Sequence, residues 1–294
     1  MYRFALLVTT IALTLTTACG PSETDLAGMR CEGQIATDPA GNPTVRVFSL
    51  GILQDVDAMT DYEGYIRIFE DAMAEQAPCF SDDIPNLVVF PEDSALMAAF
   101  IGSRGERARE ETDTEMAFTR LLANYLDPMG HYGREFPDSP PVRRLLLALT
   151  DVFGRAIEET FPPLARKYGV YVATNVNVAP YEESDDQALI DRLGDPDLTD
   201  QQTVYVATAP EVYNVAILYD PRGEEVGRVR KAYLVPAEET DLEMNYGPLE
   251  QLRPIETPFG RLAPVISKDA WMPDVLERFN ELGADIMLQH EAFS

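Results

Sequence analysis

The sequence predicts a single α/β domain that spans residues 43–294. The chain has 294 residues, of which 46% are hydrophobic, so it can bury a large core. From Thr44 onward, short apolar runs of strand length alternate with longer runs whose apolar residues recur at helical spacing. No internal repeat is found. Strands that alternate with helices along the whole chain are typical of one α/β domain.

The first predicted elements come in the order strand, helix, strand. Residues 45–52 are mostly apolar on both alternating faces, which predicts a buried strand. Residues 62–76 carry apolar side chains at helical spacing, and Asp61 is a suitable N-cap. Residues 87–90 form a second short buried strand that ends at Pro91. A helical stretch is expected after Ser94.

The middle of the chain is predicted to contain two insertions and a long helix. The charged residues 104–114 are expected to form an exposed excursion. Residues 142–167 are predicted to form one long helix that ends at Gly169. A strand follows over residues 170–178, and an acidic insertion runs from Tyr181 to about Gln202.

The last part of the chain returns to strands. Four further strands and one helix are expected: strands 204–207, 212–219, 262–266 and 284–289, and helix 273–282. The turn over residues 220–223, Asp-Pro-Arg-Gly, leads the chain toward Lys231.

The formal net charge of −27 excludes some classes of partner. Fifty acidic residues against 23 basic ones repel polyanions, so nucleic acid is not expected as a partner. The same surplus argues against binding to anionic lipid through a basic patch.

The N-terminus resembles a lipoprotein export signal. Residues 1–18 combine Arg3, an apolar stretch too short to span a bilayer, and small residues directly before Cys19. We expect cleavage before Cys19 and lipidation of that cysteine, with residues 19–42 as a tether. The protein would then be held outside the cytoplasm in the cell envelope, with membrane contact through the lipid anchor only. The alternative is simple cleavage and secretion.

Export would place the remaining cysteines in an oxidising compartment. If Cys19 carries lipid, Cys31 and Cys79 are left as a pair that could close one disulfide bond. The alternative is two unpaired thiols.

Three segments carry residues suited to hydrolytic chemistry. A buried strand ends in Val-Val-Phe-Pro-Glu at Glu92, and Lys231 lies in Arg-Lys-Ala-Tyr-Leu-Val-Pro-Ala-Glu-Glu. The third segment, Val-Ile-Ser-Lys-Asp-Ala-Trp-Met-Pro, carries Ser267 at the end of another predicted strand. Each segment alone has an ordinary interpretation as a surface turn, a solvated charge or a helix start. Their order and their flanking residues make the signal specific.

These segments resemble the motifs of the carbon–nitrogen hydrolase (nitrilase) superfamily, from about Val45 to the end of the chain. The resemblance implies a four-layer α-β-β-α sandwich and a site in one pocket. In that site Glu92 would be the general base, Lys231 would stabilise the tetrahedral intermediate, and Ser267 would occupy the nucleophile position. Glu239 matches the second glutamate, which helps to position the substrate, and Glu238 is an alternative. The implied reaction is hydrolysis of a non-peptide C–N bond in a small amide or nitrile, without metal or organic cofactor.

Two departures from the family pattern leave a second class of function open. Ser267 stands where the family has cysteine, and a hydroxyl is far harder to deprotonate than a thiol. The sequence also stops at Ser294, where family domains continue, so the fold is expected to be incomplete at its C-terminus. One sheet would then be short unless a partner chain, such as a second copy in a homo-oligomer, covers it. The alternative function is an inactive relative that serves as a binding or scaffolding lipoprotein.

Other chemistries have weaker support in the sequence. The two histidines, His131 and His290, do not stand at metal-ligand spacing with cysteine or glutamate, so no metal site is predicted. The segment around Ser103 misses the spacing of a serine-hydrolase nucleophile motif by one position.

Overall fold

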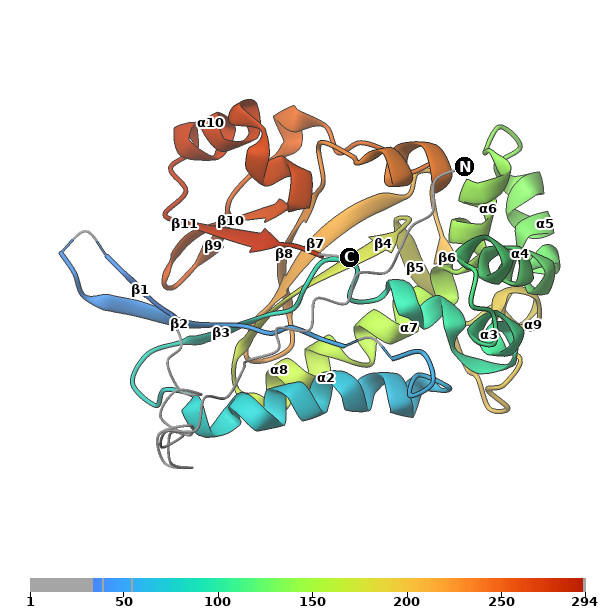
Figure 1. The fold of residues 1–294 in the computed structure, drawn as a ribbon, viewed down its shortest axis with the longest axis horizontal. Coiled ribbons are helices and arrows are strands. Elements are labelled where there is room, and N and C mark those ends of the chain that lie inside the picture. Colours follow the sequence, from blue (N-terminus) through green and yellow to red (C-terminus); the bar gives the residue numbers. More distant parts are fainter. Residues whose placement is uncertain (1–33, 39, 54, 293–294) are drawn as a thin grey trace, which may run out of the picture.

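A computed structural model describes residues 34–38, 40–53 and 55–292. The elements stack in four layers, as Figure 1 shows. Helices α2 (Tyr62–Gln76), α7 (Thr150–Glu158) and α8 (Phe161–Tyr168) cover one face of a six-stranded sheet. A three-stranded sheet covers the other face, and α10 (Pro273–Glu281) packs outside it. This mixed α/β architecture confirms the predicted fold class.

The six-stranded sheet has the order β1-β2-β3-β4-β7-β8. Its strands are β1 (Gln34–Thr37), β2 (Pro43–Ser49), β3 (Asn86–Val89), β4 (Tyr171–Val178), β7 (Tyr213–Tyr219) and β8 (Glu225–Arg230). Strands β2, β3 and β4 are parallel, whereas β1, β7 and β8 each run antiparallel to their neighbours. The central strands β3 and β4 are buried along almost their whole length because both of their faces are covered.

The three-stranded sheet contains β9 (Ile255–Thr257), β10 (Gly260–Ile266) and β11 (Ile286–His290). Strands β10 and β11 are parallel, and β9 runs antiparallel to β10. Its apolar side chains share one core with the facing side of the large sheet, where Leu87, Leu218 and Val229 are buried. A separate pair, β5 (Tyr181–Ser184) and β6 (Val204–Ala207), forms a small antiparallel sheet.

The helical face of the large sheet is closed by an aromatic cluster. Phe69 on α2, Phe90 after β3 and Phe161 on α8 have ring centroids 5.1–5.4 Å apart. Such edge-on and tilted contacts stabilise a core beyond the area that they bury. Asp61 caps α2 as predicted, since its side chain accepts the Gly64 N–H at 2.7 Å.

A cluster of short helices extends one end of the molecule (Figure 1). It contains α3 (Gly102–Arg109), α4 (Thr114–Asn124), α5 (Leu126–Glu135), α6 (Pro141–Ala148) and α9 (Gln187–Leu193). The prediction of an exposed excursion at residues 104–114 is wrong for its first part, because α3 buries Gly105 and Ala108.

The prediction of one helix over residues 142–167 is also wrong. Three helices, α6, α7 and α8, occupy this stretch. The helix is interrupted at Leu149, where ψ is 0°, and again between Glu158 and Phe161. Pro162 and Pro163 then begin α8, because a proline has no N–H for an interior helix bond but fits a first turn. Strands β8 and β9 were not predicted.

Several predictions concern the N-terminal region. The export signal over residues 1–18, Cys19 and Cys31 all lie outside the described residues. Within the predicted tether, residues 34–37 form the edge strand β1. Cys79 is buried and disulfide-bonded, whereas its predicted partner Cys31 is not described, so the pairing stays a prediction. Among the described residues, no helix combines the length and apolar character needed to cross a membrane.

Candidate active site

The site forms at one edge of the large sheet, where β3, β4 and β8 end and β7 begins. Glu92 follows β3 and Lys231 directly follows β8. Asn214 lies near the start of β7, which runs antiparallel to β4 and therefore begins at the edge where β4 ends. The Lys231 N–H donates to the Asn214 carbonyl at 2.8 Å, so register alone places these two residues side by side. Residues far apart in the sequence thus share one edge of the sheet.

A buried lysine lies between two buried carboxylates. Lys231 Nζ is 2.7 Å from Glu92 Oε1 and 2.8 Å from Glu238 Oε2. The three residues are only 1%, 5% and 7% exposed, respectively. A salt bridge with so little solvent costs desolvation energy, and breaking it leaves an uncompensated charge. Such arrangements are frequent at functional sites.

An asparagine network holds the carboxylates in place. Asn214 Nδ2 donates to Glu92 Oε1 at 2.9 Å and to Glu238 Oε1 at 2.6 Å. The Asn175 Nδ2 group donates in turn to Asn214 Oδ1 at 2.6 Å. The Oδ1 atom of Asn175 accepts the Asp93 N–H at 2.8 Å. Each amide therefore uses both its donor and its acceptor, which fixes the side-chain orientations.

The burial of this cluster shifts its proton affinities. Burial is the main cause that raises the pKa of Glu92 to about 7, with repulsion from Asp93 next, against the opposing Lys231 charge. Burial also raises the pKa of Asp93. Burial alone would lower the pKa of Lys231, but the carboxylates of Glu92 and Glu238 outweigh it and raise that pKa. The cluster therefore combines a lysine that stays protonated with a carboxylate that titrates near neutral pH.

Ser267 occupies a strained turn at the end of β10. Its φ of 45° lies in the left-handed region, which is unusual for a residue other than glycine. Parallel β10 and β11 pair Ile266 with His290, so the next residues, Ser267 and Glu291, are also neighbours. The Ser267 hydroxyl accordingly donates to Glu291 Oε1 at 3.0 Å. The backbone geometry thus presents this hydroxyl to a carboxylate.

The turn after Ser267 is tied to the segment that carries Lys231. Asp269 accepts the main-chain N–H groups of Ala232 at 3.1 Å and Tyr233 at 2.8 Å. Burial is the main cause that raises the pKa of Asp269 to about 6. Lys268 Nζ donates to the Leu234 carbonyl at 2.7 Å. These bonds connect the end of β10 with the residues that directly follow Lys231.

The end of β11 also contacts the segment that carries Glu92. The Glu92 N–H donates to the Glu291 carbonyl at 3.4 Å, and His290 Nδ1 lies 2.9 Å from the Phe90 carbonyl oxygen. Ser267 therefore reaches the Glu92 segment through Glu291. Within the site, Glu92 and Lys231 touch directly, whereas Ser267 contacts Glu291.

The structure distinguishes the two glutamates that were candidates for the second carboxylate. Glu238 faces Lys231 and Asn214, and its Oε2 also accepts the Val235 N–H at 2.8 Å. Glu239 is exposed and hydrogen-bonds with Tyr246 instead. Both belong to a π-helical turn, Ala237–Asp241, whose wider winding sets which of two adjacent residues turns inward.

Sequence reasoning did not assign roles to Asn214, Asn175 or Glu291. A signal was present for Glu291, since it comes two residues after the predicted strand 284–289 and so lies near that strand's carboxyl end. Asn175 and Asn214 lie within buried strands, and buried amides in such positions need polar partners.

The histidines and acidic groups give no metal site in the described part of the chain. No cluster of three or more potential ligands occurs there. Burial lowers the pKa of His290 to about 4, so its ring is neutral at pH 7. His131 lies on α5, in the helical cluster at the end of the molecule.

Similar proteins are found among solved structures. No curated protein is found to be similar to the sequence. Among solved structures, a carbon-nitrogen hydrolase from Helicobacter pylori G27 is 15% identical with a TM-score of 0.45, over 85% of this chain and 59% of that one. Saccharomyces cerevisiae Nit3, a member of branch 10 of the nitrilase superfamily, is 18% identical with a TM-score of 0.41, over 83% and 62%. The chain thus spans less than two thirds of the length of these proteins.

A family model covers the part of the chain that contains Lys231, Glu238 and Ser267. Residues 159–293 match the model of the family described as carbon-nitrogen hydrolase. This region is just under half of the chain, and Glu92 precedes it. The match supports the carbon–nitrogen hydrolase superfamily for this chain.

Proposed function

We propose that the protein hydrolyses a non-peptide C–N bond in a small amide or nitrile. The observation that carries this proposal is the buried contact between Lys231 Nζ and Glu92 Oε1 at 2.7 Å. Acyl transfer from an amide needs a base for the nucleophile's proton and a positive group near the developing oxyanion. A carboxylate with a pKa near 7 and a fixed lysine supply both.

For an amide the reaction divides into two balanced steps. Ser267 Oγ attacks the carbonyl carbon while a carboxylate takes the hydroxyl proton, and Lys231 faces the oxyanion. The C–N bond then breaks, the proton passes to the leaving nitrogen, and an ester with Ser267 remains. Water attacks this ester with the same base, which releases the carboxylic acid and regenerates the hydroxyl. Glu238 takes the substrate-positioning role in this scheme, since it lies beside Lys231.

Two carboxylates can serve as the base, and they are separable by mutation. Glu92 is assigned this role by the motif resemblance, whereas the hydroxyl of Ser267 is bonded to Glu291. We expect the full-length protein to release ammonia from some member of a panel of small amides and nitriles, and Glu92→Gln to remove that activity. If Glu291→Gln abolishes activity and Glu92→Gln does not, the base is Glu291. No ammonia from any substrate, with either serine or cysteine at position 267, would reject the proposal.

A second function, that of an inactive binding lipoprotein, is favoured by one observation. Ser267 replaces the more acidic thiol of the family pattern, and a base with a pKa near 7 is poorly matched to an alcohol. This alternative keeps the same pocket and predicts ligand binding without turnover.

We also propose that the protein is held in the cell envelope by lipid on Cys19. The support is the short apolar stretch that ends in Thr-Ala-Cys. Metabolic labelling with a fatty acid is expected to mark the wild-type protein and not the Cys19→Ala variant. A mature N-terminus at any other residue would contradict the proposal and favour secretion.

A further inference from the structure

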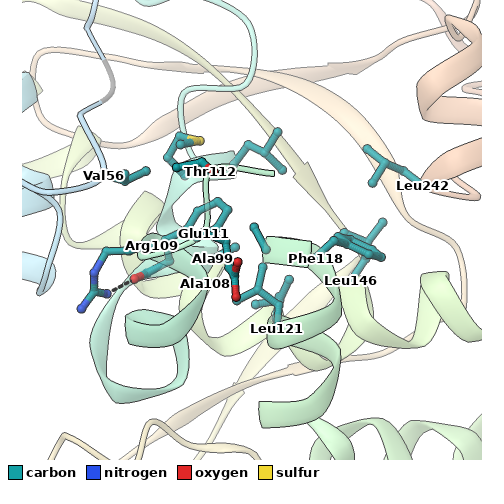
Figure 2. A pocket seen from close by; sticks show the side chains of 15 residues that line it. Val56, Ala99, Ala108, Arg109, Glu111, Thr112, Phe118, Leu121, Leu146 and Leu242 are labelled. Carbon is teal, nitrogen blue, oxygen red and sulfur yellow. Dashed lines mark hydrogen bonds between the residues drawn. The ribbon is translucent and has the colours of Figure 1, made fainter. Parts of the chain in front are cut away.

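An apolar cavity is lined in part by helices of the helical cluster, and Figure 2 shows the side chains around it. Its volume is about 360 Å³, within the range of small-molecule pockets. Twelve of its fifteen lining residues are apolar. They include Ala108 on α3, Ala117 and Leu121 on α4, and Leu146 on α6.

The polar residues of the lining do not call for a polar ligand. Arg109 donates to the main-chain carbonyls of Phe100 and Gly102, and Glu111 pairs with Arg120 at 2.9 Å. Thr112, the third polar residue, is exposed. Of the described side chains that are buried without a hydrogen-bond partner, none lines this cavity. A ligand group that fits here is therefore apolar, because a polar one would be buried unpaired.

Two lining residues connect the cavity to the site. The Leu96 N–H donates to the carbonyl of Asp93, the residue after Glu92, at 3.0 Å. Leu242 closes the π-helical turn that carries Glu238, and its N–H donates to the Ala237 carbonyl at 2.9 Å. Each of these lining residues therefore follows, four positions later in the chain, a glutamate that contacts Lys231: Leu96 follows Glu92 and Leu242 follows Glu238.

We infer that this cavity holds the hydrocarbon chain of an aliphatic amide whose carboxamide end reaches Lys231. The inference rests on the proposed function and narrows its substrate class to amides with an unbranched alkyl chain. At roughly 30 Å³ for a water-sized group, 360 Å³ holds at most about twelve such groups, so a chain of about ten carbons fits. Burial of each added methylene should strengthen binding about fourfold until the cavity is full.

The test combines calorimetric binding with hydrolysis, using the full-length protein and the primary amides from acetamide to dodecanamide. Affinity is expected to rise about fourfold per methylene and to level off near ten carbons. The heat-capacity change of binding should be negative and grow with chain length. Affinity that does not depend on chain length, or no binding at all, would overturn the inference. The absence of binding would be expected if another protein segment fills the cavity.

A matched pair of variants locates the chain. Ala117→Leu adds volume inside the cavity, whereas Ala123→Leu makes the same change at an exposed position of the same helix. We expect Ala117→Leu to weaken decanamide binding at least tenfold and to leave acetamide hydrolysis unchanged, and Ala123→Leu to change neither. Ala108→Leu gives a second test if Ala117→Leu fails to fold.

The two proposals fail in different ways. Ammonia release from acetamide with no effect of chain length or of Ala117→Leu would overturn the cavity inference and retain the hydrolase. Binding that depends on chain length, with no ammonia from either the wild type or the Ser267→Cys protein, would reject the hydrolase and support the cavity as an acyl-chain site.

Discussion

Replacing Ser267 by cysteine is expected to raise kcat/KM for amide hydrolysis by roughly a hundredfold or more. A thiol has a pKa near 8.5, about one to two units above that of a base with a pKa near 7, whereas an alcohol is far less acidic. The strained turn at φ 45° and the bond to Glu291 are set by the β10–β11 register, so the substitution should keep the geometry. Ammonia release over a panel of amides and nitriles measures the gain.

Three controls make this result specific to the site. Ser103→Cys introduces a thiol at an exposed serine on α3 and should leave activity at the wild-type level. Alkylation with iodoacetamide should inactivate the Ser267→Cys protein and spare the wild type. Glu92→Gln in the Ser267→Cys background should remove the gain, because it removes the base.

Two outcomes would contradict this argument. A folded Ser267→Cys protein that is inert on the whole panel would mean that the rest of the site is not competent, which favours the binding lipoprotein. An efficient wild-type enzyme would mean that serine does not impair the chemistry. A cooperative thermal melt of each variant must come first, since an unfolded variant is also inert.

The layer arrangement could be predicted because burial leaves a local pattern in the sequence. β3 and β4 are covered on both faces, and the apolar residues Leu87–Val89 and Val172–Ala173 mark them in the sequence. β8 was missed because it begins with exposed residues and contains Gly227, and β9 because it has only three residues. Within residues 142–167, Pro162 and Pro163 mark the start of α8 in the sequence, whereas no proline or glycine marks the break at Leu149.

The site was predictable only to the extent that motifs mark strand ends. Glu92 and Lys231 were selected from their motifs, and the structure places them in contact. The choice between Glu238 and Glu239 depends on a π-helical turn, and no local pattern distinguishes two adjacent glutamates. The roles of Asn214 and Glu291 follow from strand register across the chain, which is tertiary information.

Glu92→Gln is expected to stabilise the fold above pH 7 while it removes the base. The pKa of Glu92 rises from an ordinary value near 4.5 to about 7 on folding, so the folded state holds this proton more tightly than the unfolded state. The contribution of Glu92 to wild-type stability therefore falls as pH rises from about 4.5 to 7, and its loss is then complete. A shift of this size corresponds to about 3 kcal/mol at pH 8. Glutamine stands in for the protonated form, so the variant avoids this loss.

Urea unfolding of the wild type and Glu92→Gln at pH 4.5 and pH 8 measures the effect. The two proteins should have similar free energies of unfolding at the lower pH, and the variant should be more stable at the higher one. Glu239→Gln removes an exposed carboxylate from the same part of the chain and should change stability by less than about 0.5 kcal/mol at either pH. A variant that is less stable than the wild type at pH 8 would mean that the Lys231 ion pair outweighs the cost of burying the charge. Greater stability of the variant at pH 8 would instead mean that burying the charged Glu92 destabilises the wild-type fold. The same burial raises the pKa of Glu92 and so suits it to act as a base, which is a cost in stability that the function requires.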